Sequence, residues 1–465
     1  MSRNYHLTQD QETVTGMFWL PEDKKNSFPG RLSMELGKRA RLETAQFNYG
    51  GWSNMFPGAP KSMQGEKLHL QGQEVTRAMR APSHQVIHGH DEHGKEITLM
   101  KAISGGSGGT LAMSRQIYDC HSAVFGALLT PEHDRFSGLR LRVDHLDEWV
   151  GRCAFQHHAE TYEDHDGKKR LAKLTVPVAK QLSIPLNLTD YHASQFFCAW
   201  NMSCGTQRFE LNGKVYLDLL FVDPKPWKEV LTELHRWEWL FSLATRDTLN
   251  LSYLELYPAT ADSPPTDFPS EGCPVWIKRR NSSLPAHPKR TAHDFHFTFQ
   301  DVESQFADLV GRWQRLQITN GWEAVLHRFF AVTCPRNLYS NEQFLFLAQA
   351  VESMHRGRYG SHKQNVDLQQ AAKTAWENAP HGLQQLIGKK KAFQDRFRKT
   401  RNYWTHYGEP GPATDEQVLD DLDLIKFSQN LRFLIEAALL QELGVPESYV
   451  EKVWSGQWRA HWISF

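Results

Sequence analysis

The spacing of apolar residues changes once along the chain, and this change constrains the fold more than any other feature. Residues 1–260 contain short stretches in which apolar and polar residues alternate, such as "PGRLSMELGKRARLETAQF" and "EKLHLQGQEV". This two-residue period is typical of paired β-strands. After residue 300 the period becomes 3.6, with Phe306, Leu309, Val310 and Trp313 on one helical face. We therefore predict an α+β protein, with a β-rich N-terminal domain (1–260) followed by an all-α helical bundle (300–465).

The segment 261–299 between these halves is rich in proline, serine and charge, which predicts a connection between domains. Within it, "CPVWIKRR" could still form a strand. One helix is expected in the β-rich half, because its apolar residues share a helical face: Val230, Leu231, Leu234, Trp237 and Phe241. The glycine-rich "SGGSGG" (104–109) lacks the lysine of a phosphate-binding loop, so we interpret it as a flexible loop between strands.

The balanced charge of the sequence excludes a protein that binds nucleic acid or other polyanions through a net positive charge. Lysine plus arginine and aspartate plus glutamate both number 53 in the 465 residues, so affinity for nucleic acid requires a local patch. The beginning of the chain has no apolar stretch of a signal peptide, and no segment is long and apolar enough for a membrane span. The six cysteines are scattered and form no CxxC, as in proteins with reduced thiols. These features predict a cytoplasmic protein without membrane attachment.

A histidine-rich stretch, "HGHDEH", offers possible metal ligands. His88, His90, Asp91 and His93 are residue types that bind zinc and other transition metals. The same residues also suit the polar tip of a β-hairpin, with a turn at "DEHG". A metal-dependent hydrolase that uses this cluster is therefore one alternative function.

Positive charge is concentrated in one segment of the helical half. "KKKAFQDRFRKTRNYW" (389–404) contains seven basic residues and a single acidic one, Asp395. The next helix, expected from residue 415 to 442, begins with several acidic residues. The basic segment could form a solvated face paired with that acidic helix, or it could bind phosphate groups.

The basic segment ends in "RNYWTHYG" (401–408), where residues of possible catalytic use share one stripe of a helix. Arg398, Asn402 and His406 follow one another at intervals of four, and Arg401 lies one residue from that stripe. His406 lies in the last turn before a run of glycine and proline. The negative end of the helix dipole there favours the protonated imidazole.

Two other arginine–histidine pairs have the same five-residue separation but a different context. Arg140 precedes His145, and Arg152 precedes His157, both in the β-rich half. Neither arginine is followed by asparagine, and neither lies in a basic segment. We therefore predict that only the pair at 401–406 takes part in chemistry.

The helical half resembles the HEPN domain, whose nuclease members carry an arginine, a polar residue and, a few residues later, a histidine. "RNYWTHYG" is similar to this motif in its four-residue spacing. Upstream, "FLFLAQAVESMHR" resembles the acid-bearing helix of the ApeA-like branch, which places Glu352 at its characteristic glutamate. In the N-terminal half, "GMFWLPEDKKNSFPGRLSMEL" and "HRWEWLFSLATRDTLNLSYLEL" resemble the opening and the close of the ApeA N-terminal domain.

This resemblance implies a metal-independent ribonuclease that acts in bacterial anti-phage abortive infection, without a cofactor. Arg401, Asn402 and His406 would be its catalytic residues, and Glu352 would support them. Arg398 and Lys399 would bind flanking phosphates of the RNA, with tRNA among the substrates considered. Its expected partners are an RNA substrate, a phage protein that triggers it and a second copy of the chain in a homodimer. A non-catalytic scaffold built on the same helical bundle is the other alternative.

Overall fold

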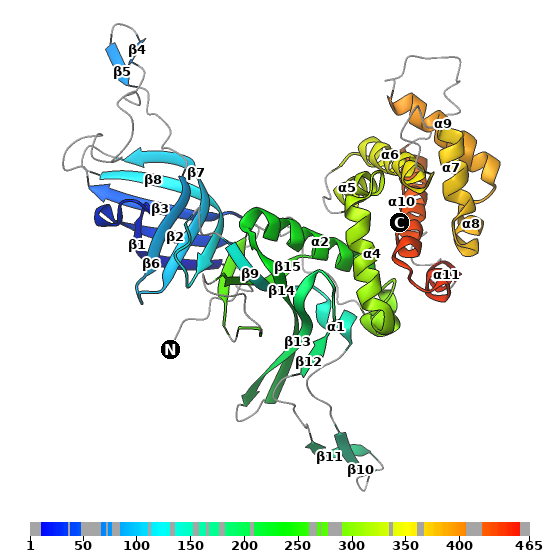
Figure 1. The fold of residues 1–465 in the computed structure, drawn as a ribbon, viewed down its shortest axis with the longest axis horizontal. Coiled ribbons are helices and arrows are strands. Elements are labelled where there is room, and N and C mark those ends of the chain that lie inside the picture. The colour runs from blue at the N-terminus through cyan, green and yellow to red at the C-terminus, as the bar shows by residue number, and fades with distance from the viewer. Residues whose placement is uncertain are drawn as a thin grey trace.

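The structure is a computed structural model, and it confirms the predicted α+β class (Figure 1). It describes residues 11–35, 38–47, 67–70, 73–76, 84–109, 113–130, 135–151, 158–163, 166, 168–175, 182–204, 209–259, 267–269, 271–277, 291–333, 338–359, 367–405 and 421–455. Strands dominate the described part up to residue 277, and helices dominate it from residue 299 onward.

The strands form one large sheet with two small hairpins beside it. Its order is β12-β13-β14-β9-β15-β16-β8-β3-β2-β1-β6-β7, and β7 also pairs with β8, so the second part of the sheet closes on itself (Figure 1). At Gly16, a side chain would collide with the backbone oxygen of His90, so glycine lets β1 and β6 approach. The bounds are β1 (Gln11–Trp19), β2 (Phe28–Glu35), β3 (Ala40–Phe47), β6 (His84–Asp91), β7 (Glu96–Gly109), β8 (Met113–Phe125), β9 (Arg135–Val143), β12 (Leu182–Pro185), β13 (Tyr191–Cys204), β14 (Phe209–Pro226), β15 (Leu251–Pro258) and β16 (Cys273–Ile277).

The expected hairpins are confirmed. "PGRLSMELGKRARLETAQF" supplies β2 and β3, and "EKLHLQGQEV" supplies the separate pair β4 (Lys67–Leu70) and β5 (Gln73–Thr76). The other small pair is β10 (His158–Glu163) with β11 (Lys169–Thr175). β16 lies inside the predicted connection and pairs with both β15 and β8.

Two predictions in this half were wrong. The glycine-rich segment 104–109 is not a loop, because it extends β7 and pairs with β8 from Ser104 to Gly109. Pairing with a neighbouring strand here outweighs the low strand propensity of glycine and serine. A second helix, α1 (Leu146–Val150), was not expected, because its five residues are too few to display a period.

A continuous aromatic core joins the two halves. α2 (Trp227–Thr245) is the expected helix, and it packs on β9 and β14. Trp149 of α1 is fully buried, and its indole N–H donates to the carbonyl of Phe297 at 2.8 Å. Its ring contacts Phe241 of α2, Phe299 of α3 (Phe299–Val302) and Phe306 of α4 (Phe306–Ile318). The first helices of the bundle are therefore anchored on the strand-rich half.

The helical half is a bundle in which α6 (Ser340–Tyr359) packs against α5 (Trp322–Thr333) and α10 (Asp421–Leu443). α9 (Lys390–Thr405) packs against α7 (Leu368–Glu377) and also contacts α6. α8 (His381–Ile387) contacts α11 (Glu447–Ser455). α9 contains most of the basic segment 389–404, and α10 corresponds to the helix expected at 415–442. Residues 406–420 lie outside the described part.

Candidate active site

α9 separates an apolar face from a basic face, and this separation follows from its sequence. Phe393, Phe397 and Thr400 recur at helical spacing and are buried. Arg396 and Arg398 lie between them in the sequence and are exposed. Burial of the phenylalanines therefore fixes the rotation of α9, and that rotation leaves positive charge at the surface.

Arg401 is held by Glu352, which lies 49 residues earlier on α6. The guanidinium Nε donates to Glu352 Oε1 at 2.9 Å, and Nη2 donates to Oε2 at 3.4 Å. The side chains are 22% and 11% exposed, respectively, so the arginine remains open to solvent on one side. A two-point contact with a carboxylate fixes the plane and direction of a guanidinium. The contact with Glu352 therefore fixes the orientation of the Arg401 guanidinium at the surface of α9.

Glu352 occupies its position because α6 is packed on both sides of it. The apolar stripe of Phe344, Leu347, Ala348 and Val351 is buried in the bundle. Glu352 follows directly after this stripe and is itself buried. A buried carboxylate requires a partner of opposite charge, and Arg401 provides it.

The other predicted site residues of α9 lie around Arg401. Asn402 and Arg398 are exposed, and Lys399 is half-buried. His406 lies outside the described residues, one position after the end of α9. The structure thus brings Arg401 and Glu352 into contact and places Asn402, Arg398 and Lys399 on the same helix, while the placement of His406 remains a prediction.

α9 also contacts α7 through charged and polar side chains. Lys390 Nζ lies 2.9 Å from Glu377 of α7, and Asp395 accepts from Gln369 of α7 at 3.2 Å. At the start of α10, Asp423 lies 3.8 Å from Lys426 of its own helix. The acidic residues 415, 416 and 420 lie outside the described part, so the predicted pairing of α9 with the acidic segment stays open there.

The histidine-rich stretch forms the end of a hairpin. His88 is buried in β6, and its Nε2 lies 2.6 Å from the carbonyl oxygen of Leu129. Asp91 Oδ1 accepts the backbone N–H groups of His93 and Lys95, which closes the turn expected at "DEHG". In the described part of the chain, no three His, Cys, Asp or Glu side chains converge as metal ligands. The geometry therefore favours the hairpin interpretation over a metal site at His88–His93.

Sequence reasoning missed a half-buried histidine on α6. His355 lies one turn after Glu352, and its ring lies 4.9 Å from that of Tyr359. Burial lowers the pKa of His355, while the nearby carboxylate of Asp367 opposes this shift. Its spacing of three residues from the acid was a signal that could have found it.

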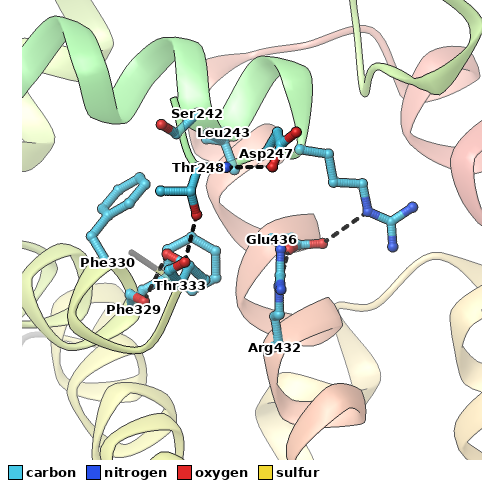
Figure 2. Close-up of a pocket in the computed structure, with 10 residues that line it drawn as sticks. Ser242, Leu243, Asp247, Thr248, Phe329, Phe330, Thr333, Arg432 and Glu436 are labelled. Carbon is cyan, nitrogen blue, oxygen red and sulfur yellow. Dashed lines mark hydrogen bonds and ion pairs between the residues drawn. The ribbon is translucent and has the colours of Figure 1, made fainter. Parts of the chain in front are cut away.

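Sequence reasoning also missed a buried charge cluster where α2, α5 and α10 meet. Figure 2 shows a small pocket lined by Ser242, Leu243, Arg246, Asp247, Thr248, Phe329, Phe330, Thr333, Arg432 and Glu436. Glu436 accepts from Arg432 at 2.7 Å, and Arg246 Nε lies 3.8 Å from its second oxygen. A lone glutamate in the apolar run "LRFLIEAALL" was the sequence signal for this cluster.

Comparison with known protein families covers both halves of the chain. Residues 13–313 match the family described as ApeA N-terminal domain 1, and residues 345–449 match the family described as Apea-like HEPN. No curated protein and no solved structure gave a significant match. None of the helices in the described ranges is long and apolar enough to cross a membrane. Because the first match spans well over half of the sequence, and the second contains both Glu352 and Arg401, the chain belongs to the ApeA family and carries an ApeA-like HEPN domain.

Proposed function

We propose that the protein is an anti-phage effector that cleaves RNA with the residues at the end of α9. The observation that carries this proposal is the contact between Arg401 and Glu352, at 2.9 and 3.4 Å, within an ApeA-like HEPN domain. The contact leaves a fixed, partly exposed cation directly before Asn402 on a basic helix. A fixed cation of this kind suits a phosphate group whose charge increases during reaction.

The proposed reaction is an attack of a ribose 2′-hydroxyl on the adjacent phosphate. A bond forms between the 2′-oxygen and phosphorus, and the bond between phosphorus and the 5′-oxygen breaks. The products are a 2′,3′-cyclic phosphate and a 5′-hydroxyl. A base takes the 2′-hydroxyl proton, and an acid gives a proton to the departing 5′-oxygen.

Each proposed residue has one task in this reaction. His406 serves as general acid or base, and Arg401 stabilises the charge on the phosphoryl oxygens. Asn402 orients the phosphate or His406, and Glu352 orients Arg401. Arg398 and Lys399 bind the neighbouring phosphates of the RNA. Side chains supply all of the proton transfers and charge stabilisation in this scheme.

A second copy of the chain would complete the site. One chain supplies one acid–base histidine from the motif, whereas the reaction uses both an acid and a base. Three large apolar side chains at the end of α9 and the start of α10 are exposed: Tyr403 (39%), Leu422 (69%) and Ile425 (41%). Exposed aromatic and aliphatic residues of this size are typical of an interface core. We therefore expect a homodimer that brings two motifs together.

The strand-rich domain is proposed to bind the phage component that triggers cleavage. The helical half contains all of the residues assigned to the reaction, which leaves the large sheet without a catalytic task. Residues 84–91 and 103–109 of this domain belong to strands β6 and β7. Any recognition by this domain would therefore use strand surfaces as well as the turns between them.

The experiment that tests the function is RNA cleavage by the purified full-length protein in EDTA. We expect fragments that end in a 2′,3′-cyclic phosphate, and we expect none from His406→Ala. Fragments with a 5′-phosphate would indicate attack by an activated water and would reject the proposed chemistry. Intact RNA under all conditions, including co-expression with phage proteins, would favour a non-catalytic scaffold.

A further inference from the structure

A buried cluster of charges around Glu436 joins the strand-rich domain to α10, the helix that contacts both α6 and α9 of the candidate site. Glu436 belongs to α10, and its side chain is only 2% exposed. Its partners come from three segments that are far apart in the sequence. Arg432 is on α10 itself, Arg246 caps the end of α2, and His296 precedes α3. The cluster therefore joins elements that the chain connects only through long intervening segments.

Arg246 enters the cluster through an unusual backbone conformation. α2 ends at this residue with φ of 60°, in the left-handed region that residues with side chains seldom adopt. The side chain is 8% exposed, and its guanidinium lies over the rings of Phe433 and Trp454 at 5.2 and 5.4 Å. Both rings belong to the last two helices of the bundle, α10 and α11. The end of α2 is therefore bound to this bundle by charge and by cation–π contacts.

The charges of the cluster keep Glu436 ionised although it is buried. Burial raises the pKa of this carboxyl, but Arg432, His296 and Arg246 together hold its pKa well below the usual range. His296 is fully buried, and burial lowers its pKa, while its contact with Glu436 opposes this shift. Its backbone N–H donates to Ala244 of α2 at 2.8 Å, which ties this segment to the same helix end. Removal of Arg246 would therefore leave Glu436 with fewer compensating charges.

α10 connects this cluster to the two helices of the candidate site. Nine residues before Glu436, the ring of Phe427 stacks on Phe344 of α6 at 6.1 Å and lies 5.4 Å from Phe393 of α9. α6 carries Glu352 and α9 carries Arg401, whose contact fixes the guanidinium. A displacement of α10 therefore acts on both sides of that contact.

We propose that the contact between Arg246 and Glu436 is a latch through which the strand-rich domain restrains the nuclease site. While the latch is closed, α10 holds α6 and α9 in the resting arrangement. A ligand of the strand-rich domain that draws the end of α2 away from α10 shifts the bundle to its active arrangement. This inference rests on the proposed function, because it assigns the regulation of the same site.

The test compares Arg246→Met with Arg236→Met in the full-length protein. Arg236 is a matched control, because it lies on the same helix and contacts another buried carboxylate, Glu233, at 3.2 Å. That carboxylate belongs to α2 itself, so the control breaks an ion pair without touching α10. Two measurements are made on each variant without any phage component: the rate of RNA cleavage, and hydrogen–deuterium exchange in α6, α9 and α10.

We expect Arg246→Met to cleave RNA about tenfold faster than the wild type, within the usual range of coupling between two sites. We also expect faster exchange in α6 and α9, and wild-type behaviour from Arg236→Met. Equal cleavage rates and equal exchange in the two variants would overturn the latch. If no variant cleaves RNA but exchange in α6 and α9 still rises in Arg246→Met, the latch stands and the proposed nuclease function fails.

Should Arg246→Met not fold, Arg246→Lys provides the same comparison with a smaller change. Lysine keeps the positive charge beside Glu436 but loses the flat stacking of a guanidinium on Phe433 and Trp454. It should raise both cleavage and exchange by a smaller factor than Arg246→Met. Wild-type cleavage and exchange in a folded Arg246→Lys protein would overturn the proposal.

Discussion

Arg140 and Arg401 both precede a histidine by five residues, yet their surroundings differ completely. Arg140 lies in the middle of the sheet and makes two hydrogen bonds to Asp218, at 2.7 and 3.0 Å, with Glu255 at 3.5 Å. Its guanidinium also lies 4.5 Å from the ring centre of Phe197. Among the described residues, Arg401 contacts one carboxylate, and its side chain has a larger exposed fraction, 22% against 14%. Arg140 is therefore fully used by the fold, whereas Arg401 retains the capacity to bind a phosphate.

The secondary structure explains why one spacing has two meanings. Five residues span about 16 Å in a strand, but only about 7.5 Å in a helix. Arg140 belongs to β9, and His145 lies beyond its end, 3.8 Å from Asp247. Arg401 lies on α9, and His406 is the residue directly after the last residue of that helix, Thr405. An arginine and a histidine five residues apart are therefore closer together along a helix than along a strand, although they lie on different stripes of the helix.

The sharpest test of this comparison is loss of RNA cleavage. Arg401→Ala and His406→Ala should each reduce the rate by roughly 10² to 10⁴, as loss of a charge-stabilising group or an acid–base group does. His145→Ala and His157→Ala should cleave at rates within about threefold of the wild type, on the scale of a small perturbation. The measurement is single-turnover cleavage of a labelled RNA. Wild-type cleavage by His406→Ala would show that the site lies elsewhere.

The second test measures the free energy of unfolding. Here we expect the larger effect from the substitution of Arg140 and the smaller effect from the substitution of Arg401. Arg140→Ala leaves Asp218 fully buried without its ion-pair partner, which should cost about 3–5 kcal/mol. Arg401→Ala leaves Glu352, whose side chain is 11% exposed, without its partner, and it should cost less, about 1–3 kcal/mol, because solvent reaches one side of this pair. Urea denaturation followed by circular dichroism gives both values. Replacement of both partners, Arg140→Met with Asp218→Leu, should recover part of the loss, since Asp218 no longer remains as an unpaired buried charge, whereas Glu255 still loses its contact with Arg140.

The third test concerns the carboxylate that orients Arg401. Glu352→Gln keeps an oxygen acceptor of the same shape but removes the charge-assisted, two-point contact. We expect roughly a tenfold loss of cleavage rate, because a misplaced guanidinium stabilises the transition state less well. Glu255→Gln is the matched control, because that carboxylate contacts Arg140 at 3.5 Å. Equal cleavage by Glu352→Gln and the wild type would reduce Glu352 to a purely structural role.

The sequence predicted the main features of the fold because each half repeats its own period many times. The strands β2 and β3 and the helices α4, α6, α9 and α10 all follow from patterns in the sequence. The strand status of the glycine-rich segment 104–109 could not be predicted, because pairing with β8 decides it. Spacing also placed Arg398, Arg401 and Asn402 on one helix, whereas the contact of Arg401 with Glu352 depends on how α6 and α9 pack.

The same limit applies to the cluster at Glu436. Arg246, His296 and Glu436 lie in different elements, and no local pattern connects them in the sequence. Spacing suggests one partner of Glu436, Arg432, which lies four residues before it on the same helix. Tertiary packing selects the partners from other elements, which is why this contact between the domains became visible only in the folded chain.

The smallest expected effect concerns the salt dependence of RNA binding, and it separates exposed cations from partly buried, paired ones. Arg398 is exposed on α9. If it binds a phosphate of single-stranded RNA, Arg398→Ala should weaken binding a few-fold and reduce the slope of log affinity against log salt by about 0.7. Arg142 is the matched control, because its guanidinium is bound to Asp147 at 2.7 Å in the strand-rich half. Arg142→Ala should leave the slope unchanged.

The assay is fluorescence anisotropy at several salt concentrations, in the His406→Ala background to prevent cleavage. An unchanged slope in Arg398→Ala would show that the basic face of α9 is a solvated helix surface, and it would restrict phosphate recognition to Arg401 and its immediate neighbours.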